Sequence, residues 1–203
     1  FSFHPVKIIT TAEGGLATTQ NQKLAESMDL ARSHGITRDP MLYEDPSQGS
    51  WYYEQITLGF NYRMTELQAA LGLSQMKRLK EIVDRRTALA ARYDKLLANL
   101  PVQRPIQAPS TGSSWHLYVI QVPQNHHSQI FDYLKRAGIG VNIHYIPIHR
   151  HPFYRSMGFK LGQFPNAESY YSKSISIPLY FGLTEKDQDQ VCATLEQCFR
   201  RIT

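Results

Sequence analysis

Residues 115–144, with the sequence WHLYVIQVPQNHHSQIFDYLKRAGIGVNIH, decide the fold class of this chain. β-Branched and aromatic residues predict two strands, at 115–122 and 139–144, and the segment between them predicts a helix over 128–137 that ends at Gly138. We expect the two strands to pair in one sheet. Three elements follow: a helix near residues 167–174, a strand at 175–178 and a helix from Thr184. Because strands and helices alternate, the sequence predicts a compact α/β unit.

A stretch rich in proline and serine, residues 101–114, precedes this unit and has the composition of a linker. A domain boundary is therefore expected near it. Residues 65–100 have helical spacing and predict two helices or one bent helix. Thr65 and Gln68, three residues apart, form the pattern of a capping box and predict where the first helix begins.

The N-terminal residues predict a β-hairpin. Residues 8–11 and 16–19 are rich in β-branched side chains and lie on either side of Gly14 and Gly15. Paired glycines can take the backbone conformation of a tight hairpin turn. This hairpin is expected to stay outside the sheet of the C-terminal α/β unit.

A helix and a long loop are predicted next. Asn21 is expected to cap a helix over residues 22–33, and Gly35 is expected to end it. Residues 36–60 contain prolines, Pro46 among them, together with glycines and a cluster of aromatic residues. They predict an irregular loop, and loops of this length are more often functional than idle.

Composition and charge exclude several classes of protein. The 203 residues are 42% hydrophobic and 19% charged, which argues against a disordered chain. The net charge of +5 is modest and spread along the chain, so we expect no nucleic-acid partner. No apolar run is long enough for a membrane span and no signal peptide is visible, so a soluble cytoplasmic protein is expected. Cys192 and Cys198 are expected to be partly buried free thiols.

Lys7 is the first candidate for chemistry. It follows Ser2-Phe3-His4-Pro5-Val6 at the mouth of the predicted hairpin. A lysine amine can form a Schiff base with a carbonyl cofactor, and the hydroxyl of Ser2 could hold the phosphate of the same cofactor. The spacing alone favours a plainer interpretation, in which Lys7 is an exposed lysine beside a strand.

Two further groups of polar residues are candidates for binding. Asn61 and Arg63 lie just before a predicted helix start and suit an anion, although they could equally brace the helix. Three histidines between residues 144 and 151 match no standard zinc spacing, so no metal site is expected. His144, Tyr145 and Arg150 are expected instead to line a pocket for a hydroxyl-rich, anionic substrate. Motifs of hydrolases and of NAD-binding proteins are absent from the sequence.

Taken together, these segments resemble the DegT/DnrJ/EryC1/StrS family of sugar aminotransferases, which are pyridoxal-phosphate enzymes. The resemblance runs from Phe1 to the C-terminus and rests on short motifs at residues 2–7, 10–15, 59–64, 68–71, 116–118 and 144–147. Residues 113–118 and 144–149 are most similar to the aminotransferases that act on UDP-4-keto-6-deoxy-N-acetylhexosamines in the pseudaminic acid pathway.

The resemblance implies a fold class and a division into domains. The fold is α/β, the C-terminal part of a PLP-dependent transferase fold of type I, the aspartate aminotransferase type. Residues 1–64 are expected to form the C-terminal part of the large cofactor-binding domain, 65–111 connecting helices and a linker, and 112–203 the small domain. Residue 1 is not Met and the first half of the family pattern is absent, so a fragment that holds little cofactor alone is expected.

The resemblance also implies a reaction. Lys7 is implied as the Schiff-base lysine, Ser2 as a ligand of the cofactor phosphate, and Asn61 as a phosphate ligand in the neighbouring site of a homodimer. The implied reaction takes an amino group from an amino acid, glutamate, and passes it to C4 of a UDP-linked 4-keto sugar. Two alternatives stay open: a non-catalytic regulator or scaffold with the same fold, and a sugar dehydratase, against which Lys7 argues because a histidine replaces the lysine there.

Overall fold

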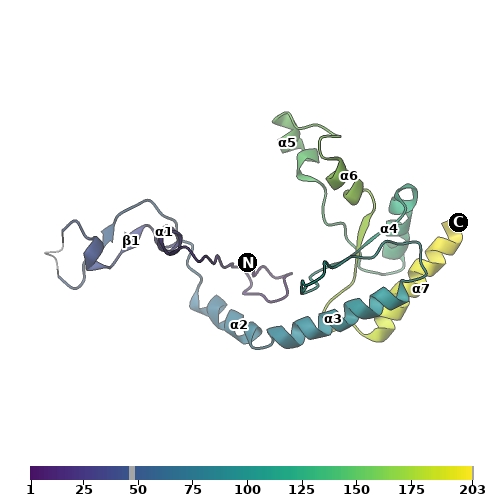
Figure 1. The fold of residues 1–203 in the computed structure, drawn as a ribbon, viewed down its shortest axis with the longest axis horizontal. Helices are drawn as coiled ribbons and strands as arrows, with labels where there is room; N and C mark the ends of the chain where they lie inside the picture. The colour runs from purple at the N-terminus through teal and green to yellow at the C-terminus, as the bar shows by residue number, and fades with distance from the viewer. Residues whose placement is uncertain (46–48, 203) are drawn as a thin grey trace. The chain divides into compact units, whose positions relative to one another are not determined.

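The computed structural model describes residues 1–45 and 49–202, so that Pro46 of the predicted loop and Thr203 of the predicted small domain lie outside the described residues. Two units are present, Phe1–Leu79 and Lys80–Thr203 (Figure 1). The boundary follows Leu79, so all but the first residue of the helix that begins there lies in the second unit. The expected division at residues 64 and 111 concerns a complete enzyme and stays a prediction.

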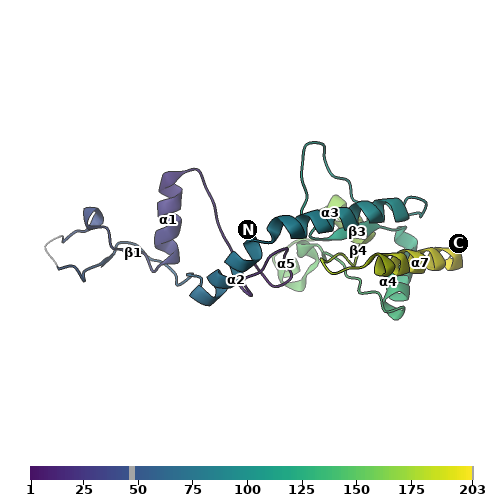
Figure 2. The same ribbon diagram turned by 90° about the horizontal axis from the view of Figure 1, so that it is seen from below.

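The second unit has one hydrophobic core, to which five elements contribute. These are α3 (Leu79–Leu96), β3 (Tyr118–Gln121), α4 (His127–Arg136), β4 (Ser174–Ile177) and α7 (Glu185–Ile202). Figure 2 shows α4 and α7 side by side, and the two helices are in contact. Four short helices lie outside the core: η2 (Gln124–His126), η3 (Ile148–Arg150), α5 (Pro152–Ser156) and α6 (Pro165–Tyr171).

The sheet of the second unit has a different strand order from the predicted one. β3 pairs antiparallel with β4, with Tyr118 opposite Ile177. Residues 139–144 do not pair with β3 as predicted; they reach only the far side of β4, through a bridge between Asn142 and Ser176. All four residues of β4 are buried. β4 has β3 along one edge and Asn142 at the other. It therefore lies between β3 and residues 139–144, although these two segments follow one another in sequence.

Two tyrosines of this core form hydrogen bonds through their hydroxyl groups. The hydroxyl of Tyr93 donates to the carbonyl of Pro178 at 2.9 Å, and that of Tyr118 donates to Asp94 Oδ1 at 2.5 Å. Burial raises the pKa of both phenols above the ordinary value. Cys192 and Cys198 are buried and free, as predicted, and burial raises the pKa of the Cys192 thiol to about 12. Both cysteines are therefore packing residues.

Arg86 on α3 is a buried cation of the second unit. Its side chain donates to three backbone carbonyls, those of Trp115 at 2.9 Å, His116 at 2.8 Å and Leu179 at 2.9 Å. Only 7% of the residue is exposed, and burial lowers the pKa of its guanidinium. The Arg86 side chain thus links α3 to the residues just before β3 and to the residues just after β4.

In the first unit, the predicted helix starts and stops are confirmed. Asn21 caps α1 (Gln22–Arg32), accepting from the N–H of Leu24. The helix ends at Arg32, and just beyond it Gly35, which has a φ of +70°, donates from its N–H to the carbonyl of Leu30 at 2.7 Å. The capping box of Thr65 and Gln68 opens α2 (Glu66–Met76), so residues 65–100 contain two helices. Each of these helix boundaries depends on residues that are close in sequence, so the local backbone is enough to form it.

The described part of residues 36–60 is mostly loop, as predicted, but it contains three short elements that the sequence did not predict. β1 (Ile36–Thr37) pairs antiparallel with β2 (Glu54–Gln55), and η1 (Pro40–Leu42) lies between them. Thr37 is buried within this short hairpin. A β-branched pair that can bury one side chain is enough to form a two-residue ladder at the base of the loop.

The predicted hairpin of residues 8–11 and 16–19 is wrong. Residues 1–3 pair with residues 14–16 instead: the N–H of Phe3 donates to Gly14 O at 2.9 Å and the N–H of Leu16 donates to Phe1 O at 3.0 Å. The hydroxyls of Thr10 and Thr11 donate to nearby backbone carbonyls, which offers the chain an alternative to a strand ladder. The segment between the pairs is therefore a closed loop that contains Lys7.

Within the residues that the structure describes, no helix has the length and the apolar character needed to cross a membrane.

Candidate active site

Lys7 lies in a loop whose backbone is held at both ends. The paired residues 1–3 and 14–16 close the loop, and Thr11 N donates to Phe3 O at 3.0 Å across it. The N–H of Lys7 donates to His4 O at 2.9 Å, which makes a tight turn just before the lysine side chain. Lys7 is half-buried, and its amine forms no ion pair with any residue that the structure describes. A lysine so placed is anchored through its backbone while its amine stays available.

Ser2 lies in the same loop, at the point where the paired ends meet. It forms the bridge with Gly15, and its Oγ accepts from the N–H of His4 at 3.5 Å. Since a hydroxyl has one donor and two acceptor sites, this contact leaves the Ser2 proton for another acceptor. The structure therefore brings Ser2 and Lys7 onto one hydrogen-bonded loop, as candidates for one site.

Asn61 has a fixed backbone and an exposed side chain. Phe60 and Tyr62 donate from their N–H groups to the carbonyls of Ala31 and Arg32, at 2.7 and 2.9 Å, at the end of α1. The rings of Phe60 and Tyr62 stack with their centroids 4.8 Å apart. Thr65 and Gln68 cap α2, so Asn61 is not needed for that purpose. No hydrogen bond joins the Asn61 side chain to another described residue, which leaves its amide for a ligand.

The candidate substrate residues lie in the second unit. His144 Nδ1 lies 2.7 Å from Ser176 Oγ, and the ring of the exposed Tyr145 meets the His144 ring edge-on, with centroids 4.6 Å apart. Arg150 lies elsewhere, with its guanidinium 4.9 Å from the centre of the Tyr171 ring. The structure thus brings His144 and Tyr145 together but pairs Arg150 with an aromatic ring, and their joint role in binding substrate stays a prediction.

His149 has a role that the sequence did not indicate. It is 7% exposed, and its Nε2 donates to Glu168 Oε1 at 2.7 Å. The N–H of Gly162 donates to the same oxygen at 2.7 Å. The bond from His149, with a smaller contribution from Gly162, lowers the pKa of Glu168. The partners are 19 residues apart, and no sequence spacing would have joined them. Among the described residues, no group of three or more His, Cys, Asp or Glu could hold a metal ion.

Comparison with known proteins supports an aminotransferase fold. The model of the DegT/DnrJ/EryC1/StrS aminotransferase family matches residues 1–196. The UDP-4-amino-4,6-dideoxy-N-acetyl-beta-L-altrosamine transaminase of Campylobacter jejuni is 35% identical, over 100% of this chain and 52% of the relative. The chain spans about half the length of the curated relatives it matches.

Solved structures agree with the family match. PseC of Helicobacter pylori, an aminotransferase involved in the biosynthesis of pseudoaminic acid, superposes with a TM-score of 0.87 at 31% identity, over 99% of this chain and 53% of that one. Spr1654 of Streptococcus pneumoniae, solved in PMP and PLP forms, reaches 0.87 in the PMP form at 27% identity, over 100% of this chain and 53% of that one. The fold is therefore that of the PLP-dependent sugar aminotransferases, and the chain belongs to the DegT/DnrJ/EryC1/StrS aminotransferase family.

Proposed function

We propose that this chain carries the lysine-bearing part of an aminotransferase that moves an amino group from an amino acid, glutamate, to C4 of a UDP-linked 4-keto-6-deoxy-N-acetylhexosamine. The observation that carries the proposal is the loop of Lys7 and Ser2, closed at both ends by backbone hydrogen bonds. The likeness to a transaminase of a UDP-linked amino sugar supports the substrate class. The proposed reaction takes place in the cytoplasm, in a homodimer with shared sites.

The residues present fit pyridoxal phosphate by the chemistry of their donor groups. The cofactor has an aldehyde and a phosphate, and the Lys7 loop offers a primary amine and a hydroxyl whose proton has no other acceptor among the described residues. The Asn61 amide adds a neutral donor for a phosphate oxygen. Bound pyridoxal phosphate would supply an electron-withdrawing ring, which stabilises negative charge on the carbon beside the transferred nitrogen.

The residues of this chain then have separate tasks. Lys7 would hold the cofactor through its amine. When an incoming amine displaces Lys7, its free Nζ would accept a proton from one of the two carbons beside the transferred nitrogen and return it to the other. Its anchored backbone keeps that amine within reach of both positions, which is the requirement for moving a proton between them. Ser2 donates to the cofactor phosphate, and His144, Tyr145 and Arg150 bind the sugar nucleotide.

The site of attachment tests the proposal. Borohydride reduction of the full-length protein loaded with pyridoxal phosphate is expected to leave a pyridoxyl label on Lys7 after peptide mapping. Lys23, exposed on α1 of the same unit, is the internal control and should stay unlabelled. A label on a different lysine would refute the assignment of Lys7. A folded full-length protein that takes no label would favour the alternative of a non-catalytic regulator or scaffold.

The proposed sharing of sites between subunits has its own test, which uses Asn61. Full-length Lys7→Ala and Asn61→Ala proteins, each impaired alone, are mixed under conditions that exchange subunits. If Asn61 serves the neighbouring site, half of the dimers are mixed and half of their sites are intact, so activity recovers to about a quarter of the wild-type value. No recovery after exchange has been verified would show that Asn61 acts within its own chain.

A further inference from the structure

Ser176, on the buried strand β4, holds residues 142–144 through its N–H, its carbonyl and its hydroxyl. The N–H of Ser176 donates to Asn142 O at 2.8 Å, and its carbonyl accepts from the N–H of Asn142 at 3.2 Å. The side-chain Oγ lies 2.7 Å from His144 Nδ1. Ser176 is only 5% exposed. One residue of the packed core therefore fixes both the backbone of this segment and the direction of the His144 ring.

The hydrogen bonds also assign the proton of the His144 ring to one of its two nitrogens. Asn142 Oδ1 accepts from the N–H of Ile143 at 2.8 Å, so the amide nitrogen of Asn142 is the atom that faces His144. That nitrogen lies 3.4 Å from His144 Nε2, and an amide nitrogen can only donate. Nε2 is therefore the acceptor, and Nδ1 carries the proton and donates to Ser176 Oγ.

The ring of Tyr145 is oriented in turn by the ring of His144. The two rings meet edge-on, at 86° and with centroids 4.6 Å apart, which is a favourable arrangement for aromatic side chains. Tyr145 is 67% exposed, and its hydroxyl forms no hydrogen bond with any residue within 1–45 and 49–202. Because solvent surrounds most of this side chain, its direction depends on the His144 ring beside it.

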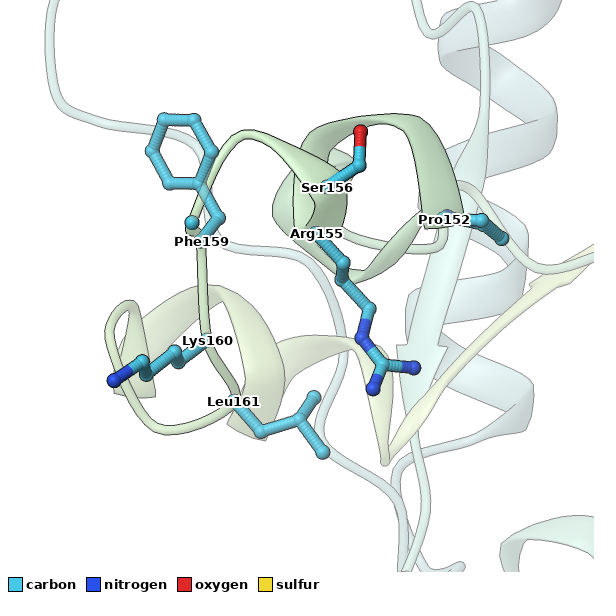
Figure 3. Close-up of a pocket in the computed structure, with 7 residues that line it drawn as sticks. Pro152, Arg155, Ser156, Phe159, Lys160 and Leu161 are labelled. Carbon is cyan, nitrogen blue, oxygen red and sulfur yellow. The ribbon is translucent and has the colours of Figure 1, made fainter.

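Two cations that follow η3 along the chain are not held in this way. Arg155 and Lys160 help to line a hollow of about 630 Å³, and Figure 3 shows their side chains extending in different directions. Neither side chain has a hydrogen bond or an ion pair with a described residue. In this arrangement the two cations do not converge on one ligand, whereas the His144 ring has a partner at each nitrogen.

We propose that Ser176 is the positioning residue of the pair His144 and Tyr145. Its Oγ accepts the Nδ1–H of His144 and fixes that ring, and the ring fixes the direction in which the Tyr145 hydroxyl meets the substrate. A side chain that is fixed before the ligand arrives lowers the entropic cost of binding. The substrate part of this inference rests on the proposed function, which assigns His144 and Tyr145 to the sugar nucleotide. The tautomer of His144 does not, because it follows from the hydrogen bonds alone.

¹⁵N NMR of the full-length protein, labelled in histidine, measures this tautomer without substrate or cofactor. The two ring nitrogens are distinct, and the His144 signals are those missing from His144→Gln. The wild type is expected to show a protonated Nδ1 and an unprotonated Nε2. Ser176→Val and Ser176→Thr have nearly the same shape, but only the second keeps a hydroxyl. Ser176→Val is expected to lose the Nδ1–H form, because a buried N–H without an acceptor is costly, and Ser176→Thr is expected to keep it.

Ser174→Ala is the matched control. Ser174 lies on the same face of β4, is 0% exposed, and its Oγ has no hydrogen-bond partner among the described residues. Removing this hydroxyl should leave the His144 tautomer unchanged. Circular dichroism checks that each variant folds. The wild-type spectrum needs no substitution, and a wild-type His144 that carries its proton on Nε2 would overturn the inference.

The role toward the substrate has a separate measurement, the KM and the kcat of amino transfer. Ser176→Val is expected to raise the KM for the sugar nucleotide about three- to tenfold, the size of one ordinary hydrogen bond, and to leave kcat within about twofold of the wild-type value. Ser176→Thr should restore the KM to within about twofold of the wild type, because the hydroxyl is present again.

The outcomes separate this inference from the proposed function. Folded Ser176→Val protein that keeps the wild-type tautomer would overturn the inference, and so would a changed tautomer with an unchanged KM, because the ring would then not direct the substrate. A folded protein in which Lys7 takes no label, but His144 carries its proton on Nδ1 and loses it from there in Ser176→Val, would remove the aminotransferase function and keep Ser176 as the residue that positions the ring.

Discussion

Full-length protein with Lys7→Ala is expected to carry out amino transfer at least about a thousandfold more slowly than the wild type in a single turnover. A positioned general acid–base group contributes roughly 10²–10⁴-fold, and Lys7 is proposed both to attach the cofactor and to move the proton. The loop of Lys7 is closed by backbone bonds of residues 1–3, 11 and 14–16, none of which needs the lysine side chain. The substitution should therefore leave the fold intact.

The measurement is single-turnover amino transfer, which reports the chemical step apart from product release. Lys7→Arg keeps the positive charge but has no amine that can attach the cofactor, so it should be as inactive as Lys7→Ala. Lys23→Ala, on the exposed face of α1, is the matched control and should turn over at the wild-type rate. A Lys7→Ala protein that retains more than about a tenth of the wild-type rate would contradict the assigned role.

The largest expected effect on stability comes from Arg86. Arg86→Met keeps a long apolar stem but removes the donors of three hydrogen bonds, to Trp115, His116 and Leu179. Each buried carbonyl that loses its donor costs about 1–3 kcal/mol, and some of that cost is relieved as the structure relaxes. We therefore expect the free energy of unfolding of the second unit to fall by about 3–5 kcal/mol.

Hydrogen exchange of β3 and β4 amides in the full-length protein would measure this loss, because it reports the stability of that sheet by itself. Lys80→Met is the control. Lys80 pairs with Asp84 on the surface of the same helix, and an exposed pair contributes about 0–1 kcal/mol. A loss for Arg86→Met no larger than that of the control would show that the three carbonyls find other partners.

Helix ends were predicted well because each depends on residues that are close in sequence. Asn21 and the pair Thr65–Gln68 satisfy the first free N–H groups of their helices directly. Gly35 and Gly138 have positive φ values and lie just beyond the ends of α1 and α4, as predicted. The physical reason is that capping involves neighbours within about four residues, so the rest of the protein has little influence on it.

Strand pairing was predicted poorly, because a strand's partner is chosen by burial across the whole unit. The β-branched residues 8–11 resemble a strand, but the threonine hydroxyls bind local carbonyls and residues 1–3 take the pairing position. Residues 139–144 were expected to pair with the strand at residues 115–122. β4, buried at every position, occupies that place instead. Alternating hydrophobicity identifies a strand, but it does not say which strand lies next to it.

The sequence by itself determined the α/β class of the C-terminal unit, the helix ends, and Lys7 and Ser2 as candidates for cofactor chemistry, because these depend on side-chain chemistry and short-range geometry. Only the tertiary structure decided that Lys7 lies in a closed loop, that β4 lies between β3 and Asn142, and that His149 meets Glu168 across 19 residues. Such contacts form when the chain buries apolar surface and must then satisfy the polar groups buried with it. Which residues far apart in sequence come into contact depends on the packing of the whole unit, so it cannot be read from a local sequence pattern.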